Sequence, residues 1–130
     1  MKQATLGWVE RAEGDYRAAV VLLSAAQPVS EAACFHAQQC AEKYLKAFLQ
    51  EHDIRVPHTH DLLNLAQRTA PLAPDLAVLE TDLAVLNVYA VEIRYPGAGV
   101  EPAQAQAALR TAEAVRRLVR QALGLGEEPR

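Results

Sequence analysis

The sequence predicts an all-α fold, an up-and-down four-helix bundle with one additional short helix between the second and fourth helices. Apolar residues recur at alternating steps of three and four, which is the spacing of one face of a helix. Aromatic residues make up only 5% of a chain that is 51% apolar, and an alanine-rich composition of this kind favours closely packed helices over sheets. Proline and glycine positions separate the periodic segments by short connections.

The first predicted helix covers residues 4–26, with Asp15 beside its apolar stripe. The second runs from Ser30, a suitable N-cap, to Glu51. The most regular face of this second helix carries five residues at steps of three and four: Phe35, Gln38, Glu42, Leu45 and Leu49.

Two of these five positions, Gln38 and Glu42, are polar, although a plain packing seam carries aliphatic side chains throughout. A polar group inside a helix interface costs free energy unless it is paired. We therefore expect either that the partners of Gln38 and Glu42 lie on neighbouring helices, or that the seam belongs to a binding site or to an interface with a second subunit. Gln39, Lys43 and Lys46 flank the seam and add polar groups to it.

A short third helix is predicted to start at Thr59, with Asp61 in its first turn. The fourth helix begins at Pro74, continues through leucines at helical spacing, and has to end before Pro96.

The fifth predicted helix opens at Pro102 and stops near Gly124. Its inward face consists of small residues, namely Ala105, Ala108, Ala112, Val115, Val119 and Ala122. We expect a single domain over residues 1–125 and a disordered C-terminal tail over residues 126–130.

The bulk properties exclude some classes of protein. A net charge of −3 disfavours a general affinity for the nucleic-acid backbone, although a local basic patch stays possible. No signal-peptide pattern and no apolar run of membrane-spanning length occur, so we expect a cytoplasmic protein without a membrane partner. Cys34 and Cys40 lie about 120° apart on one helix and cannot bridge each other there.

Arg94 and Tyr95 end an apolar helix directly before a proline–glycine loop. An arginine at this place can bind phosphate or carboxylate in a bidentate manner. Alternatively, Arg94 caps the last carbonyls of its helix or pairs with Glu42 or Asp15. The two interpretations are compatible if a carboxylate orients Arg94 while Arg94 binds the ligand.

His58 and His60 stand two residues apart where the third helix begins. Such a pair can supply metal ligands or an acid/base group, or one ring packs while the other is solvated. His36 and Cys40, four apart on the second helix, offer an even weaker metal pattern. Since no carboxylate or cysteine cluster accompanies these residues in sequence, we expect neither a metal nor a cofactor.

The spacing from Arg55 to His60 is one that some metal-independent ribonucleases use, with the histidine as acid/base and the arginine at the phosphate. The pair bridges a connector and a helix start, which leaves its geometry open, and chance explains the spacing better. The chain contains no glycine-rich phosphate loop, nucleophile elbow, zinc-type cysteine framework or evident carboxylate dyad, so no catalytic residue is assigned.

Four elements follow one another along the chain: Asp15 with Ala18, Ala19, Leu22 and Leu23; Gln38 and Gln39 with Ala41, Glu42, Lys43, Leu45, Lys46 and Ala47; His58, Thr59, His60, Asp61 and Leu62 after Pro57; and Tyr89 with Arg94, Tyr95 and Pro96. In these elements, and over most of its length, the chain resembles the HEPN (higher eukaryotes and prokaryotes nucleotide-binding) domain family.

The resemblance implies a helical bundle related to the substrate-binding domain of kanamycin nucleotidyltransferase. It implies a small protein that pairs with a minimal nucleotidyltransferase, as its accessory subunit or as a toxin to its antitoxin. Many toxic members of the family are ribonucleases with an arginine followed four to six residues later by a histidine, at the end of a late helix. Arg94 matches that arginine, but no histidine follows it, which argues against ribonuclease activity.

We therefore expect a non-catalytic nucleotide- or substrate-binding accessory subunit of a nucleotidyltransferase, itself homo-oligomeric. Its expected ligand is a nucleotide or phosphate, and its expected ligand-binding residues are Asp15, Gln38, Glu42, Lys46, His60, Arg94 and Tyr95. One alternative is a HEPN ribonuclease toxin whose histidine is lost or supplied by His60. Another is a homo-oligomeric interaction module that uses the polar seam as its interface and binds no ligand.

Overall fold

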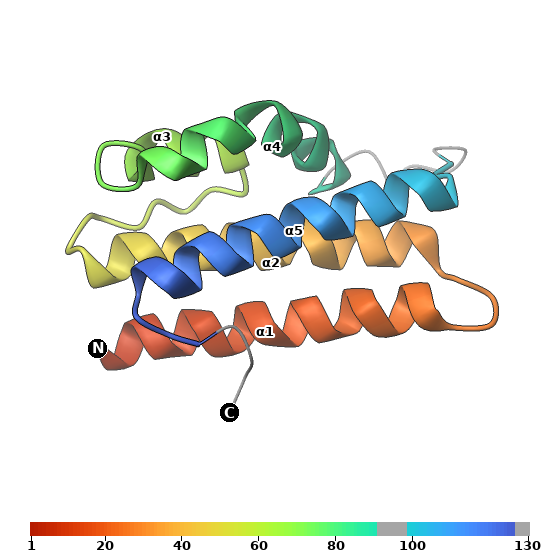
Figure 1. The fold of residues 1–130 in the computed structure, drawn as a ribbon, viewed down its shortest axis with the longest axis horizontal. Coiled ribbons are helices and arrows are strands. Elements are labelled where there is room, and N and C mark those ends of the chain that lie inside the picture. Colours follow the sequence, from red (N-terminus) through yellow and green to blue (C-terminus); the bar gives the residue numbers. More distant parts are fainter. Residues whose placement is uncertain (91–98, 127–130) are drawn as a thin grey trace.

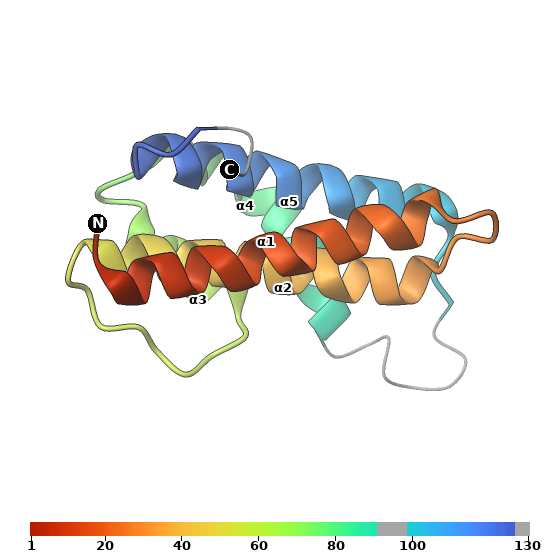
Figure 2. The same ribbon diagram turned by 90° about the horizontal axis from the view of Figure 1, so that it is seen from below.

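The computed structural model describes residues 1–90 and 99–126, which form helices and no strand, as the all-α prediction requires. Three long helices, α1 (Gln3–Ser24), α2 (Ser30–Glu51) and α5 (Pro102–Ala122), lie alongside one another (Figure 1). The shorter α3 (Leu62–Thr69) and α4 (Glu80–Asn87) form a layer on the side of α2 and α5 that faces away from α1. Figure 2 looks onto α1, with this layer behind.

Helix α2 is the centre of the core, and it contacts α1, α5 and α3. Its residues Tyr44, Leu45, Phe48 and Leu49 are fully buried, so the predicted seam is a packing seam in its second half. The buried residues of α1 and α5 include alanines, whose small side chains let helix axes approach closely: Ala12, Ala19, Ala105, Ala108 and Ala112. Both cysteines are buried and free.

The prediction of one long fourth helix is wrong. Residues 74–90 form a 3₁₀ helix, η1 (Pro74–Leu79), then α4, then a second 3₁₀ turn, η2 (Val88–Ala90). Short 3₁₀ stretches are common at the ends of α-helices, and their period of three suits the step from Leu76 to Leu79. Leu76, Leu83 and Leu86 still face the core as predicted. Prediction and structure therefore agree on a helical bundle, but the structure does not contain the four long regular helices that were predicted.

Two predicted N-caps are also wrong. Ser30 is already the first residue of α2, and Val29 occupies the cap position without a side-chain hydrogen bond. The cap of α3 is Asp61, whose carboxylate accepts from two backbone N–H groups of the first turn at 3.0 and 3.4 Å. A carboxylate there also interacts favourably with the helix dipole, which a threonine hydroxyl cannot match. Thr59 instead accepts a hydrogen bond from the Asp61 N–H.

Helix α5 begins and ends as predicted. Glu101 caps it and exchanges hydrogen bonds with Gln104 in a capping box. Gly124 adopts a φ of 75°, the left-handed conformation that ends helices and that glycine takes without strain. Ala122 is exposed, contrary to the predicted inward face. Of the expected tail, Gly126 accepts a hydrogen bond from Arg120, and residues 127–130 lie outside the described residues.

Within residues 1–90 and 99–126, no helix combines the length and the apolar character that crossing a membrane requires.

Candidate functional site

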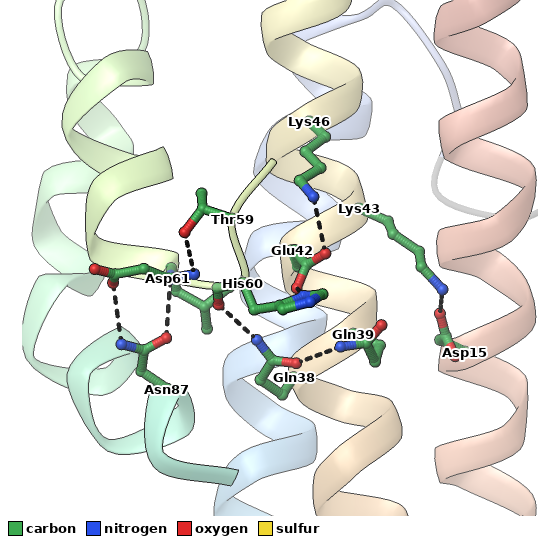
Figure 3. A network of polar contacts seen from close by, with 11 residues as sticks. Asp15, Gln38, Gln39, Glu42, Lys43, Lys46, Thr59, His60, Asp61 and Asn87 are labelled. Carbon is green, nitrogen blue, oxygen red and sulfur yellow. Dashed lines mark hydrogen bonds and ion pairs between the residues drawn. The ribbon is translucent and has the colours of Figure 1, made fainter. Parts of the chain in front are cut away.

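The candidate site is built around the carboxylate of Glu42, on the seam of α2. The Glu42 side chain is 4% exposed, and each of its oxygens has a cationic or imidazole partner (Figure 3). Lys46 Nζ lies 3.0 Å from Oε2, and His60 Nδ1 lies 2.8 Å from Oε1. A buried carboxylate is tolerated when it is paired in this way. One partner comes from α2 itself and the other from the connector of residues 52–61, not from a neighbouring helix.

Gln38, the second polar residue of the seam, fixes the same connector. Its Nε2 donates to the backbone carbonyl of His60 at 3.0 Å, and its Oε1 accepts from Gln39 at 2.7 Å. The side chain is fully buried. Gln38 and Glu42 therefore both hold His60: Gln38 binds its backbone carbonyl, and Glu42 binds its imidazole ring. In this arrangement Gln38 positions His60 and presents no exposed group to a ligand.

The His60 ring is open to solvent, with 69% of the side chain exposed. Because Nδ1 faces the Glu42 carboxylate, the neutral ring carries its proton on Nδ1 and leaves Nε2 as an acceptor. A carboxylate behind a histidine also fixes the ring's orientation. The outward nitrogen can therefore accept a proton, or, on the protonated ring, donate a hydrogen bond to an anion.

Asp15, on α1, has a separate set of partners of the same kinds. Its Oδ1 lies 2.8 Å from His36 Nδ1, and its Oδ2 lies 2.6 Å from Lys43 Nζ (Figure 3 shows the lysine). His36 and Lys43 are both partly exposed. The structure thus contains two carboxylates, each between one histidine and one lysine. His36 and Lys43 were not among the predicted site residues.

Trp8 connects α1 to the Glu42 set. The Lys46 ammonium lies 5.4 Å from the centre of the Trp8 ring, within the range of a cation–π interaction. Lys46 is therefore held from two sides, by the carboxylate of its own helix and by an aromatic face of the neighbouring helix. Trp8 is the single tryptophan of the chain and can report on this part of the protein by fluorescence.

The charges of the two sets balance while the histidines are neutral. Each set then holds one carboxylate and one ammonium, and each protonated imidazole adds one positive charge.

A second polar network lies in the core, and sequence analysis did not predict it. Glu13 of α1 accepts two hydrogen bonds from Arg116 of α5 at 2.7 and 3.0 Å, and a short one from the hydroxyl of Tyr44. Arg120 donates to the Tyr44 oxygen at 3.2 Å. In the sequence, only the place of Glu13 beside Ala12, on the predicted apolar stripe, could have indicated this network. Its partners Tyr44 and Arg116 lie too far along the chain to be inferred.

The environment of this network shifts the pKa values of its members. Burial opposes ionisation of Glu13, but the hydrogen bonds from Arg116 and Tyr44 outweigh it, and the pKa of Glu13 is lowered. Burial, with the Glu13 hydrogen bond, raises the pKa of Tyr44. The Glu13 hydrogen bonds raise the pKa of Arg116. Glu13 is thus a charged, fully partnered group that joins α1, α2 and α5.

Arg94 and Tyr95, two of the predicted ligand-binding residues, lie outside the described residues. Arg55 and His58 lie on the connector of residues 52–61. Burial raises the pKa of Cys40 far above its usual range, so the thiolate that a metal requires is suppressed beside His36. In the described part of the chain, no three His, Cys, Asp or Glu residues are grouped as a metal site requires.

Comparison with known proteins places the chain in a family. The sequence model of the HEPN domain matches residues 5–122. This chain belongs to the HEPN domain family. The fold of this HEPN domain is similar to the crystal structure of the protein TT1696 from Thermus thermophilus, with a TM-score of 0.81 and 26% sequence identity. The similarity covers 92% of this chain and 98% of that chain. No match was found among the curated proteins.

Proposed function

We propose that this HEPN domain is a non-catalytic accessory subunit that binds the phosphate-bearing part of a nucleotide or related substrate. The binding surface in this proposal is the anion face, defined as His36, Lys43, Lys46 and His60. Lys46 is buried, with 8% of its side chain exposed, and contributes its charge. The observation that carries the proposal is the exposed His60 ring, oriented by buried Glu42 next to Lys46.

The geometry supports a phosphate more than an apolar ligand. Lysine ammonium groups bind phosphate as point charges, and histidine contributes a donor when protonated. Asp15 and Glu42 hold these cations in place and keep the affinity moderate, because they neutralise part of the charge. Arg94 completes the proposed site as the bidentate phosphate ligand, on the basis of its sequence position alone.

A minimal nucleotidyltransferase is the proposed partner, and family membership supports this assignment. Co-expression with a nucleotidyltransferase encoded beside this chain tests the pairing. Co-purification in a fixed ratio is expected, and separate elution of the two proteins would contradict it.

Binding is tested by titrating ATP, inorganic phosphate and adenosine while recording Trp8 fluorescence and amide chemical shifts. ATP and phosphate should perturb His60, Lys46 and Trp8, and adenosine should not. The variants His60→Ala and Arg94→Ala should weaken binding about tenfold. The control Arg110→Ala removes an equal charge from an exposed position of α5 and should leave binding unchanged. Unperturbed signals at about 1 mM ATP would end the proposal.

A ribonuclease is the second candidate, and one observation favours it. His36 and His60 each turn Nδ1 to a carboxylate, which leaves Nε2 available for proton transfer. Incubation of the native protein with total RNA, beside His60→Ala and Arg94→Ala, separates the two candidates. Cleavage that either substitution abolishes supports the ribonuclease, and intact RNA in all samples removes it.

A further inference from the structure

The segment formed by η1 and α4 is apolar on two opposite faces. Its inward residues Leu76, Leu83 and Leu86 are at most 2% exposed. On the outward side, Val78 is 80% exposed, Val85 57% and Val88 38%. Three further outward residues near these valines are small and exposed, namely Ala77, Thr81 and Ala84. We call these six outward residues the valine face.

A single exposed valine needs no explanation, but a continuous stripe does. An ordinary surface helix carries charged residues opposite its buried side, whereas a helix that is apolar all round is covered on both sides. Valine is moreover a poorer helix former than the lysine or glutamate that solvent-exposed positions favour. Figure 1 shows α4 in the outermost layer of the molecule, where no other described helix covers it.

Acidic residues flank the valine face on both sides. Within α4, at 100° per residue, Asp82 and Glu80 fall on opposite edges of the face that carries Thr81, Ala84 and Val85. Asp75 belongs to η1, where residues three apart eclipse each other, so it lies in line with Val78. All three carboxylates are exposed, and none forms a salt bridge to another described residue.

We propose that the valine face binds an amphipathic helix of a partner protein, with an aliphatic stripe flanked by lysine or arginine. The stripe supplies the apolar contact and the acidic edges select the charge of the partner. A second copy of this chain fits poorly, because acidic edges would face acidic edges in either orientation of two identical helices. This inference uses no residue of the anion face, so each proposal stands or falls separately.

Two synthetic peptides of about 15 residues test the proposal, since helices of that length are just stable enough to present one face. Both carry the same leucine stripe, flanked by lysines in one peptide and by glutamates in the other. Fluorescence anisotropy should show the lysine peptide binding to the native protein and the glutamate peptide not binding. The double substitution Val78→Ser, Val85→Ser should weaken binding about tenfold or more.

Two further variants separate specific docking from general charge attraction. Val21→Ser changes a valine of α1 that is 66% exposed, and it should leave peptide binding unchanged. The double reversal Glu80→Lys, Asp82→Lys should transfer the preference to the glutamate peptide. All these positions are exposed, and circular dichroism confirms that each variant keeps its helices.

Three results would overturn the proposal. The first is that the lysine peptide does not bind the native protein. The second is that it binds the native and the valine-substituted protein equally. Alternatively, light scattering shows a native dimer that Val85→Ser dissociates, in which case the valine face is covered by a second copy.

Discussion

Arg116 and Glu13 form a bidentate contact, with Nε 2.7 Å from Oε2 and Nη2 3.0 Å from Oε1. The contact joins α5 to α1 across 103 positions of the sequence. Glu13 is 5% exposed, and Tyr44 of α2 donates to the same carboxylate. One side chain thus fastens the three long helices to one another.

Replacement of Glu13 by glutamine should lower the free energy of unfolding by about 3 kcal/mol, because removal of one partner leaves the other charge of a buried pair uncompensated. Urea denaturation measures the change. The matched control Glu10→Gln alters an exposed residue of the same helix and should cost less than about 0.5 kcal/mol. Equal effects of the two substitutions would show that the contact contributes no stability.

The stability that Glu13 contributes should depend on pH in one direction. Its pKa is lowered below the ordinary 4.5 in the folded protein, so the stabilisation is complete above that value and is lost as the pH falls through the folded pKa. The difference in unfolding free energy between native protein and Glu13→Gln should therefore shrink from about pH 6 to about pH 3. The pKa of Glu51 is also lowered, because the Lys2 backbone N–H donates to its carboxylate. Glu51 is present in both proteins, so its contribution to the pH dependence cancels in the difference. A constant difference would contradict the assignment.

The start of α3 should depend on Asp61 and Asn87 rather than on Thr59. Asn87 of α4 accepts from the Leu62 N–H at 2.9 Å and donates to the Asp61 carboxylate at 3.1 Å. Asp61→Ala and Asn87→Ala should each cost about 1 kcal/mol, and the double variant less than the sum because the two share hydrogen bonds. Thr59→Ala should cost less than either. A larger loss at Thr59 in thermal denaturation would restore the cap predicted from the sequence.

Neither thiol should react rapidly in the folded protein. Burial raises the pKa of Cys34 to about 11 and moves the pKa of Cys40 further still, so little of the reactive thiolate exists near neutral pH. A disulfide reagent at about pH 8 should label both thiols quickly in guanidinium chloride and slowly in buffer. The variant Cys34→Ala assigns the signals. A thiol that reacts in buffer as fast as in denaturant would show that its site is open.

The polar seam illustrates how far the sequence could lead at the candidate site. Its spacing indicated that Gln38 and Glu42 face inward, and both are buried. Their shared partner, His60, belongs to an irregular connector whose path no periodicity describes. The sequence pointed to neighbouring helices, a binding site or a second subunit, because loops give no repeating signal from which a contact can be inferred.

Local rules determined much of this HEPN domain. The bounds of α2, the start of α5 at Pro102 and its stop at Gly124 follow from helix periodicity, from proline at the first turn and from glycine in the left-handed conformation. Each of these depends on interactions within a few residues, so the sequence by itself is sufficient to predict them.

Tertiary structure decided the rest. The expected fourth helix is divided into η1, α4 and η2, whose inward leucines are buried against other helices. Tertiary structure also brought Glu13 to Arg116 and Asp15 to His36 and Lys43. A helical period fixes which side chains point inward, but the partner of a buried charge depends on which distant segment packs there, and that information is distributed over the whole chain.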